Sequence, residues 1–371
     1  MTLINYLSRI HFGFGAIDKL KEELTKLDIT RPLFVSDHGV NNAGIVDNIL
    51  NISGHRDAPV FLDSPPNPTE ASVRDCLGAY IAAKCNGFVA IGGGSPIDVA
   101  KGAALLATHK GRIGDYAVLT GGSEKIGPIA PIIAVPTTAG TGSEVGWGTI
   151  ITLDTGRKIA AVNTNLTPKA VIADPELTFS MPKHITAATG VDALTHGIEA
   201  FLSPRFNPPA DAIALDCIAR IANNIELVFA DGSDREARKE MLMGSIEGGL
   251  ALQKGIGAIH AMSNPIGEYK LHHGTINAVL LPAVMDFNAQ TERENMDRIC
   301  IAIGLPKGSD LAKWSRALMQ RLDMPSGLEE MGIPKGDLVD IAYKASKENA
   351  AKTNPRLATA DDYLKMLHAS Y

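Results

Sequence analysis

The fold is decided by one stretch, Gly87-Phe88-Val89-Ala90-Ile91-Gly92-Gly93-Gly94-Ser95-Pro96-Ile97-Asp98. Its apolar first half predicts a buried strand, and the glycines that follow lead into a helix. Pro96 suits the first turn of that helix, whose free N–H groups favour an anion such as a pyrophosphate. The stretch lacks the G-x-G-x-x-G pattern of common dinucleotide-binding sites, so a tight turn built for packing stays open as an alternative.

The rest of the chain divides into two kinds of pattern. Apolar runs at 32–36, 131–135 and 169–173 also predict buried strands, and helical patterns lie between them, at 69–84 and 96–107. Strands that alternate with helices of this length predict a parallel sheet with right-handed crossovers. After about residue 180 helical periodicity prevails, at 209–230, 234–254 and 277–285. We therefore predict an α/β domain over 1–180 and an all-α domain over 181–371.

Composition points to small-molecule partners in a reducing compartment. The 371 residues carry a net charge of −6, which favours neither nucleic acid nor an anionic membrane surface. The four cysteines (Cys76, Cys85, Cys217 and Cys300) form no C-x-x-C pair, which argues against a disulfide framework. The N-terminus does not resemble a signal peptide, and the longest apolar runs are too short to span a bilayer. We expect a cytoplasmic protein.

Two further features predict ligand-binding positions in the first domain. The stretch Val135-Pro136-Thr137-Thr138-Ala139-Gly140-Thr141-Gly142-Ser143-Glu144 again follows a strand and is rich in hydroxyl groups. We expect it to face the same crevice as the first glycine loop. Asp37 follows the first strand, where a carboxylate binds ribose hydroxyls or, as an equally good alternative, caps a helix.

One carboxylate and three imidazoles suggest a divalent metal site. In Gly190-Val191-Asp192-Ala193-Leu194-Thr195-His196, Asp192 and His196 are four residues apart and share a helix face. His260 lies on another expected helix, and His272-His273-Gly274 follows. These donors suit Fe²⁺ or Zn²⁺. Spacing alone leaves open the alternative of a solvated helix surface with unconnected histidines.

Taken together, these stretches resemble the iron-containing (group III) alcohol dehydrogenase family. The matching motifs occur in the family's order: GGGSPIDVAK (92–101), PTTAGTGSEV (136–145), ADPEL (173–177), GVDALTHGIEA (190–200), GAIHAMSNPIG (257–267) and HHG (272–274). The resemblance covers about residues 10–290 and is specific because several motifs recur in one order. It implies a Rossmann-like domain followed by a helical one, the architecture shared with dehydroquinate synthase, with NAD(P) and a metal held in a cleft.

The resemblance also implies roles for individual residues. The implied metal ligands are Asp192, His196, His260 and His273, and Glu199 reads as part of the motif's helix rather than as a ligand. Asp37 implies NAD(H) rather than NADP(H). The other implied cofactor positions are Gly93, Gly94, Ser95, Asp98, Thr137, Thr138, Thr141 and Lys158. A homodimer or larger homo-oligomer is usual in the family.

One departure from the family affects the mechanism. Most members carry a second histidine four residues after the equivalent of His260, and this chain has Asn264. The metal would polarise the alcohol or aldehyde oxygen during hydride transfer to or from nicotinamide. Without that histidine, the ribose hydroxyls, a bound water or His272 are the candidates for the proton relay. The segment between His260 and His273 also looks one residue shorter than usual.

The substrate stays open between two classes at this point. Lys254, Lys270 and His272 flank His260 and would suit an alcohol or aldehyde that carries an acidic group. Leu252 and Trp147 would instead line an apolar pocket for a simple alcohol. The alternatives for the function are a zinc polyol dehydrogenase of the glycerol type, a maleylacetate reductase, a lyase like dehydroquinate synthase, and a metal-binding module without catalysis.

Overall fold

The computed structural model describes residues 4, 6, 8–290 and 292–371. Their contacts divide the chain into two compact units, over 6–180 and 181–371. Each unit has its own core and is described by itself.

The first unit is built on a six-stranded sheet in the order β1-β8-β5-β4-β2-β3, in which every pair is parallel. The strands are β1 (Arg9–Phe12), β2 (Pro32–Val35), β3 (Val60–Phe61), β4 (Gly87–Gly92), β5 (Ile132–Pro136) and β8 (Ala170–Ala173). The predicted parallel sheet is confirmed. β1 and β3 are short, and no apolar run had indicated them.

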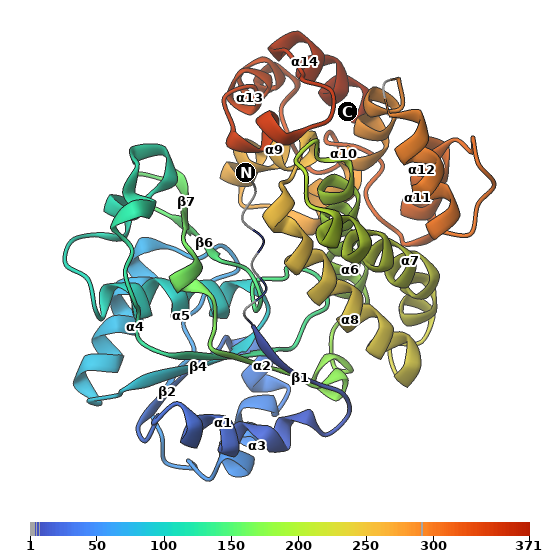
Figure 1. The fold of residues 1–371 in the computed structure, drawn as a ribbon. Helices are drawn as coiled ribbons and strands as arrows, with labels where there is room; N and C mark the ends of the chain where they lie inside the picture. Colours follow the sequence, from blue (N-terminus) through green and yellow to red (C-terminus); the bar gives the residue numbers. More distant parts are fainter. Residues whose placement is uncertain (1–3, 5, 7, 291) are drawn as a thin grey trace. The chain divides into compact units, whose positions relative to one another are not determined.

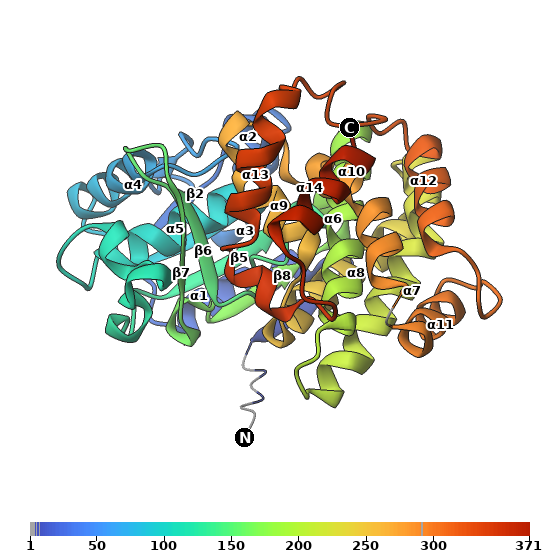
Figure 2. The same cartoon turned by 90° about the horizontal axis from the view of Figure 1, so that it is seen from above.

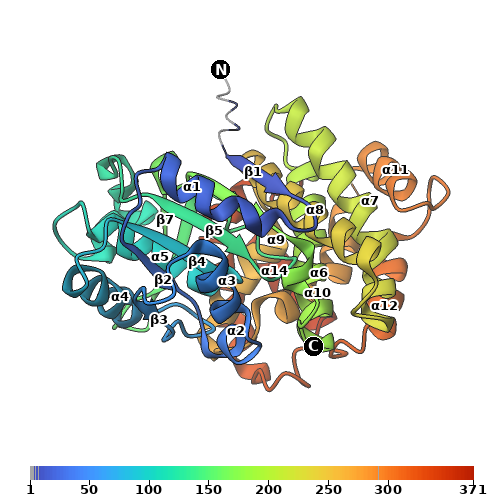
Figure 3. The ribbon, with the colours of Figure 1, turned by 90° about the horizontal axis from the view of Figure 1, so that it is seen from below.

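Successive residues of the central strands enter two different cores. Along β4, Phe88 and Ala90 belong to one core, and Val89 and Ile91 belong to the other. The first core is covered by α4 (Glu70–Ala82) and α5 (Gly94–Leu106), the second by α1 (Leu20–Lys26) and α3 (Ile45–Ser53), as Figures 1 and 3 show. Helices on both faces leave no strand face for solvent, which explains the continuous apolar runs.

A two-stranded antiparallel hairpin and a short helix complete this unit. The hairpin consists of β6 (Gly148–Thr152) and β7 (Lys158–Val162) and runs beside α5 (Figure 2). The short helix α2 (His38–Asn42) follows β2. Because the sheet is parallel, the carboxyl ends of β2, β4 and β5 lie at one edge. That edge carries Asp37, the glycine loop and the threonine-rich loop.

The second unit is helical, as predicted. It contains α6 (Lys183–Leu202), α7 (Pro208–Ala230), α8 (Arg235–Ala251), α9 (Ala258–Ile266), α10 (His273–Asn288), α11 (Arg293–Ala302), α12 (Leu311–Arg321), α13 (Leu338–Ala345) and α14 (Ala360–Ala369). Helix α6 packs against α7, α8 and α10. Every residue over 186–202 is buried, so the Asp192 side of α6 is not a solvated surface.

Among the described residues, no helix has the length and apolar character needed to cross a membrane.

Candidate active site

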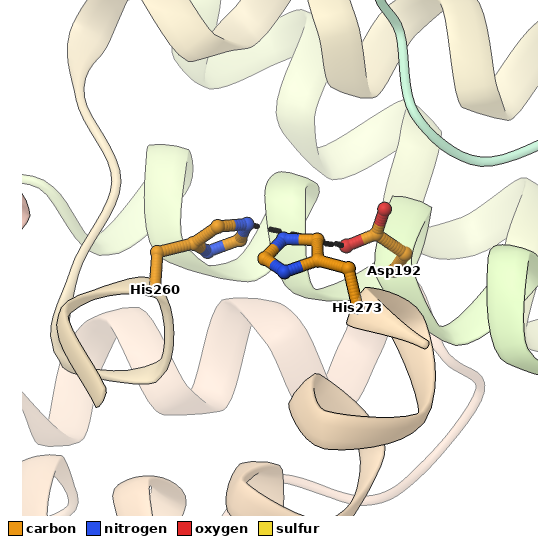
Figure 4. Close-up of side chains that lie close together, drawn as sticks. All are labelled: Asp192, His260 and His273. Carbon is orange, nitrogen blue, oxygen red and sulfur yellow. Dashed lines mark ion pairs between the residues drawn. The ribbon is translucent and has the colours of Figure 1, made fainter. Parts of the chain in front are cut away.

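Three predicted metal ligands meet in the helical unit. Asp192 comes from α6, His260 from α9 and His273 from the first turn of α10, and their side chains point toward one another (Figure 4). One ligand atom from each lies within 4.8 Å of the others. The Nε2 atoms of His260 and His273 are each 3.9 Å from Asp192 Oδ1.

His196 lies beside this group. Its Nε2 is 3.6 Å from Asp192 Oδ1, and its ring stacks on that of His260 with centroids 5.0 Å apart. The four residues are thus brought together, although the tightest group consists of three. One carboxylate and three imidazoles form a donor set that suits a borderline divalent cation, so the residues present fit Fe²⁺ or Zn²⁺.

The charge of Asp192 is held by its neighbours. Burial by itself raises the pKa of this carboxyl group, but His196, His273, His260 and the amide of Asn277 together hold the pKa below its usual range. Asp192 is only 3% exposed. A buried carboxylate that stays ionised at neutral pH is ready to bind a cation.

Gly274 allows His273 to reach the group. A Cβ atom at this position would lie 2.1 Å from the carbonyl oxygen of Ala188 and 3.3 Å from Asp192 Cβ. The first turn of α10 therefore lies directly on the backbone of α6. Only glycine permits this approach.

Replacing Gly274 by alanine is expected to displace the start of α10 and with it His273. Overpacking of this kind costs about 1–3 kcal/mol or more, and bound metal should fall well below one equivalent per chain. Metal analysis and thermal unfolding would measure both effects. Gly78→Ala is the matched control, since a Cβ at that helical position meets nothing within 4 Å. A Gly274→Ala protein with full metal content would contradict this account.

Two residues around the metal ligands had not been identified as functional. Glu199 Oε2 lies 2.6 Å from His260 Nδ1. Asn277 donates from Nδ2 to Asp192 Oδ1 at 2.7 Å, and its buried Oδ1 has no partner among the described residues. Helical spacing was the available signal, because Glu199 follows Asp192 by seven residues and Asn277 follows His273 by four.

The two predicted relay positions, Asn264 and His272, both precede His273 in the chain. His272 is the N-cap residue of α10. Desolvation lowers the pKa of its imidazole, and the negative charge of Asp192 acts in the opposite direction. Asn264, on α9, donates from Nδ2 to Glu348 Oε2 at 3.1 Å. Its amide is thus held by a carboxylate and does not titrate.

In the first unit, the two predicted cofactor loops pack against each other. A Cβ on Gly93 would lie 3.1 Å from the Thr138 side chain, and a Cβ on Gly94 would lie 3.1 Å from that of Thr141. The N–H of Thr137 donates to Gly92 O at 3.0 Å. Gly93 and Gly94 therefore allow the two loops to pack closely, as expected for the tight turn that the sequence left as an alternative. The predicted role in cofactor binding is compatible with this packing.

The remaining predicted cofactor residues have partners of their own. Ser95 Oγ donates to Pro66 O at 2.8 Å. Asp37 caps α2 by accepting the Val40 N–H on Oδ1 at 2.9 Å. Lys158 is the first residue of strand β7.

Asp98 and Lys101 fasten the threonine-rich loop to α5. Asp98 accepts Ser143 Oγ on Oδ1 at 2.6 Å and the Ile150 N–H on Oδ2 at 2.9 Å. Lys101 is fully buried, and its Nζ donates to the carbonyl oxygens of Ser143, Gly146 and Gly148 at 2.7, 2.8 and 2.8 Å. Burial lowers the pKa of Lys101 to about 8 and raises that of nearby Glu144 to about 7.

The cations predicted to flank the site have different surroundings. Lys254 is buried, donates to Phe201 O at 2.8 Å and pairs with Asp211, so its charge is balanced inside the helical unit. The idea that Lys254 supplies positive charge to a substrate is therefore wrong. Lys270 is exposed, and no acidic side chain pairs with it among residues 8–290 and 292–371.

Comparison with known proteins assigns both units to one family. A model described as iron-containing alcohol dehydrogenase matches residues 8–175, and one described as Fe-containing alcohol dehydrogenase family, C-terminal, matches residues 186–371. The chain belongs to the iron-containing alcohol dehydrogenase family. The predicted resemblance is confirmed.

Similar proteins span the whole chain. A 4-hydroxybutyrate dehydrogenase from Cupriavidus necator is 46% identical, with 100% of each chain covered. The crystal structure of a 1,3-propanediol oxidoreductase matches with a TM-score of 0.93 and 33% identity, over 100% of both chains. A sulfoacetaldehyde reductase from Bifidobacterium kashiwanohense, solved with NAD⁺, gives a TM-score of 0.90 and 28% identity, over 100% of this chain and 99% of that one.

As a member of the iron-containing alcohol dehydrogenases, the chain is an NAD(H)-dependent oxidoreductase that transfers hydride between nicotinamide and a small alcohol or aldehyde. NAD(H) and Fe²⁺ are its cofactors. The comparisons do not favour a polyol dehydrogenase, a maleylacetate reductase or a lyase like dehydroquinate synthase.

Proposed function

We propose that this dehydrogenase acts on a short alcohol or aldehyde that carries a carboxylate, with 4-hydroxybutyrate as the representative substrate. The observation that carries the proposal is the full-length similarity, at 46% identity, to a 4-hydroxybutyrate dehydrogenase. The sulfoacetaldehyde reductase, whose named substrate is also an anion, supports the same class. An anionic substrate needs a cation in the protein to balance its charge.

Lys270 is the cation that we assign to this task. It lies in the segment between α9 and α10, three residues before His273, and no described acidic residue neutralises it. Its backbone has φ = +60°, a conformation that most L-residues avoid. Such a conformation is often kept for function.

The metal ligands that we propose are Asp192, His196, His260 and His273. When bound there, the divalent cation would polarise the substrate oxygen and stabilise the negative charge on it during hydride transfer. The protein's own task is to hold the four donors in place and to hold the proton released by the alcohol. We assign His272 to this proton, because the amide of Asn264 cannot accept one. Asn264, held by Glu348, would shape the substrate pocket instead.

For NAD(H), we propose contacts from Gly93, Gly94, Ser95, Thr137, Thr138, Thr141 and Lys158, with the ribose on Asp37. The start of α5 supplies free backbone N–H groups for the pyrophosphate. Asp98 would act by holding the threonine-rich loop, because its Oδ1 accepts a hydrogen bond from Ser143 of that loop and its Oδ2 accepts one from Ile150 of β6. We further propose that the protein is a cytoplasmic homo-oligomer. Four buried, unpaired cysteines support a reducing compartment.

The substrate proposal is tested by comparing 4-hydroxybutyrate with 1-butanol, which lacks the carboxylate. A charge-assisted hydrogen bond is worth about 1.5–3 kcal/mol, so kcat/KM should favour the hydroxy acid by roughly 10- to 100-fold. Initial rates of NADH formation would measure this preference.

Lys270→Gln should remove most of that preference and leave kcat/KM for 1-butanol unchanged. Equal loss with both alcohols would show that Lys270 serves the fold rather than the substrate. A wild-type enzyme without a preference for the hydroxy acid would overturn the substrate class itself.

A further inference from the structure

The metal centre has a second carboxylate behind it. Glu199 lies on α6, seven residues after Asp192, and is 3% exposed. Its Oε2 is 2.6 Å from His260 Nδ1, and its Oε1 accepts the Ile259 N–H at 2.6 Å. We propose that Glu199 is a positioning residue of the metal centre, which fixes the tautomer and orientation of His260 and balances the charge of a divalent cation. This inference rests on the metal ligands proposed above.

The two nitrogens of the His260 ring have different surroundings. Nε2 faces Asp192 Oδ1 at 3.9 Å, on the side where the other ligand atoms gather. A histidine binds a metal through a nitrogen without a proton, so the proton must lie on Nδ1. An ionised carboxylate only accepts hydrogen bonds. Glu199 therefore selects the Nδ1–H tautomer and leaves Nε2 free for the metal.

The second carboxylate oxygen of Glu199 fixes the orientation of the carboxylate and of the His260 ring. By accepting the Ile259 N–H, Glu199 is bound both to the ring of His260 and to the adjacent backbone. The same helix, α6, also carries Asp192 and His196. One rigid element thus holds two ligands directly and orients a third from α9. Partners of this kind typically change metal affinity by about 10- to 100-fold when they are removed.

Glu199 also changes the net charge of the group of proposed ligands. The three histidines are neutral as ligands, and Asp192 supplies one negative charge. Glu199 supplies the second, so that a divalent cation would be balanced in a site where Asp192, His196, His260 and Glu199 are at most 5% exposed. Uncompensated charge in such a place is costly. Removal of the Glu199 charge should therefore disfavour the cation even where the fold persists.

Asn354 also binds a free backbone N–H at the start of α9, in addition to Glu199. The Ala258 N–H, next to that of Ile259, donates to Asn354 Oδ1 at 3.1 Å. Asn354 is 1% exposed, and its Nδ2 donates to Asn288 Oδ1 at 2.8 Å and to Arg356 O at 2.7 Å, whereas His260 Nδ1 is bonded to Glu199. Asn354→Ala therefore loosens the start of α9 without touching His260 Nδ1, which makes it the matched control.

Glu199→Gln is the decisive variant. Glutamine keeps the shape but has one acceptor oxygen for two donors, the Ile259 N–H and His260 Nδ1–H. Its NH₂ group must face one of them, which favours the wrong tautomer of His260 or leaves the N–H unsatisfied. With metal-free protein titrated with Zn²⁺, we expect the dissociation constant to rise about 10- to 100-fold. ¹⁵N NMR of labelled histidine should show loss of the Nδ1–H form of His260.

Two further variants decide between this role and a purely structural one. Asn354→Ala should lower the urea midpoint of the metal-free protein and keep the Zn²⁺ dissociation constant within about 3-fold, well below the 10-fold expected for loss of an orienting partner. Glu199→Asp keeps both acceptor oxygens and the charge, so its affinity should lie between wild type and Glu199→Gln. This variant also carries the test if Glu199→Gln does not fold.

Wild-type Zn²⁺ affinity in Glu199→Gln, or equal losses in Glu199→Gln and Asn354→Ala, would overturn the proposal. A different result is expected if the four proposed ligands do not bind the metal at all. In that case His260→Ala, which removes the ligand, would also bind Zn²⁺ as tightly as wild type.

Discussion

His260→Ala is expected to lose both its bound metal and its turnover. The imidazole is one of three groups whose ligand atoms lie within 4.8 Å of one another, and alanine offers no donor in its place. Stabilisation of oxygen charge by a metal is worth several kcal/mol. Since about 1.4 kcal/mol corresponds to a factor of ten, kcat should fall by about three orders of magnitude or more.

Metal analysis of the purified variant and initial rates with 4-hydroxybutyrate and NAD⁺ would measure the two losses. His368→Ala is the matched control, because His368 is an exposed histidine of α14, outside the metal group. An unchanged kcat in His260→Ala would remove the central role that we assign to the metal.

Lys101→Met is expected to have the largest effect on the stability of the first unit. The buried ammonium group donates to three carbonyl oxygens, and methionine would leave all three without a partner. It would also remove the positive charge that most lowers the pKa of buried Asp98. Removing one partner of a buried charged group lowers the free energy of unfolding by about 3–5 kcal/mol. The Ser143–Gly148 segment would be released, so NAD⁺ should bind more weakly as well.

Urea unfolding and an NAD⁺ titration would measure these effects. Lys21→Met is the control, since Lys21 is exposed on α1 of the same unit. If both variants lose the same small free energy of unfolding, the hydrogen bonds from Lys101 to the three carbonyl oxygens contribute nothing to stability.

Sequence patterns were sufficient for the elements with strong periodicity. The apolar runs at 32–36, 87–91, 131–135 and 169–173 correspond to β2, β4, β5 and β8. They were readable because a strand buried on both faces is apolar throughout. Strand β1 escaped prediction because Arg9 and His11 interrupt its apolar residues, and β3 escaped because it has only two residues.

Asp37 is a residue whose role the sequence alone could not predict. Both sequence readings of Asp37, ribose binding and helix capping, were consistent with its place after a strand, and the structure shows the cap. The cap uses the Oδ1 atom of Asp37. Lys254 illustrates an error of a different kind, because only the tertiary structure brings Asp211 to its ammonium group.

The sequence by itself determined that Asp192, His196 and Glu199 have the spacing of one helix face, because helical spacing is a local property, and its resemblance to the family implied the four metal ligands. Only the tertiary structure decided that this face is buried, that Gly274 lets His273 reach Asp192, and that Glu199 meets His260, a residue 61 positions away. The physical reason is that a contact between helices depends on how their side chains pack. The spacing of residues along one helix does not encode that packing.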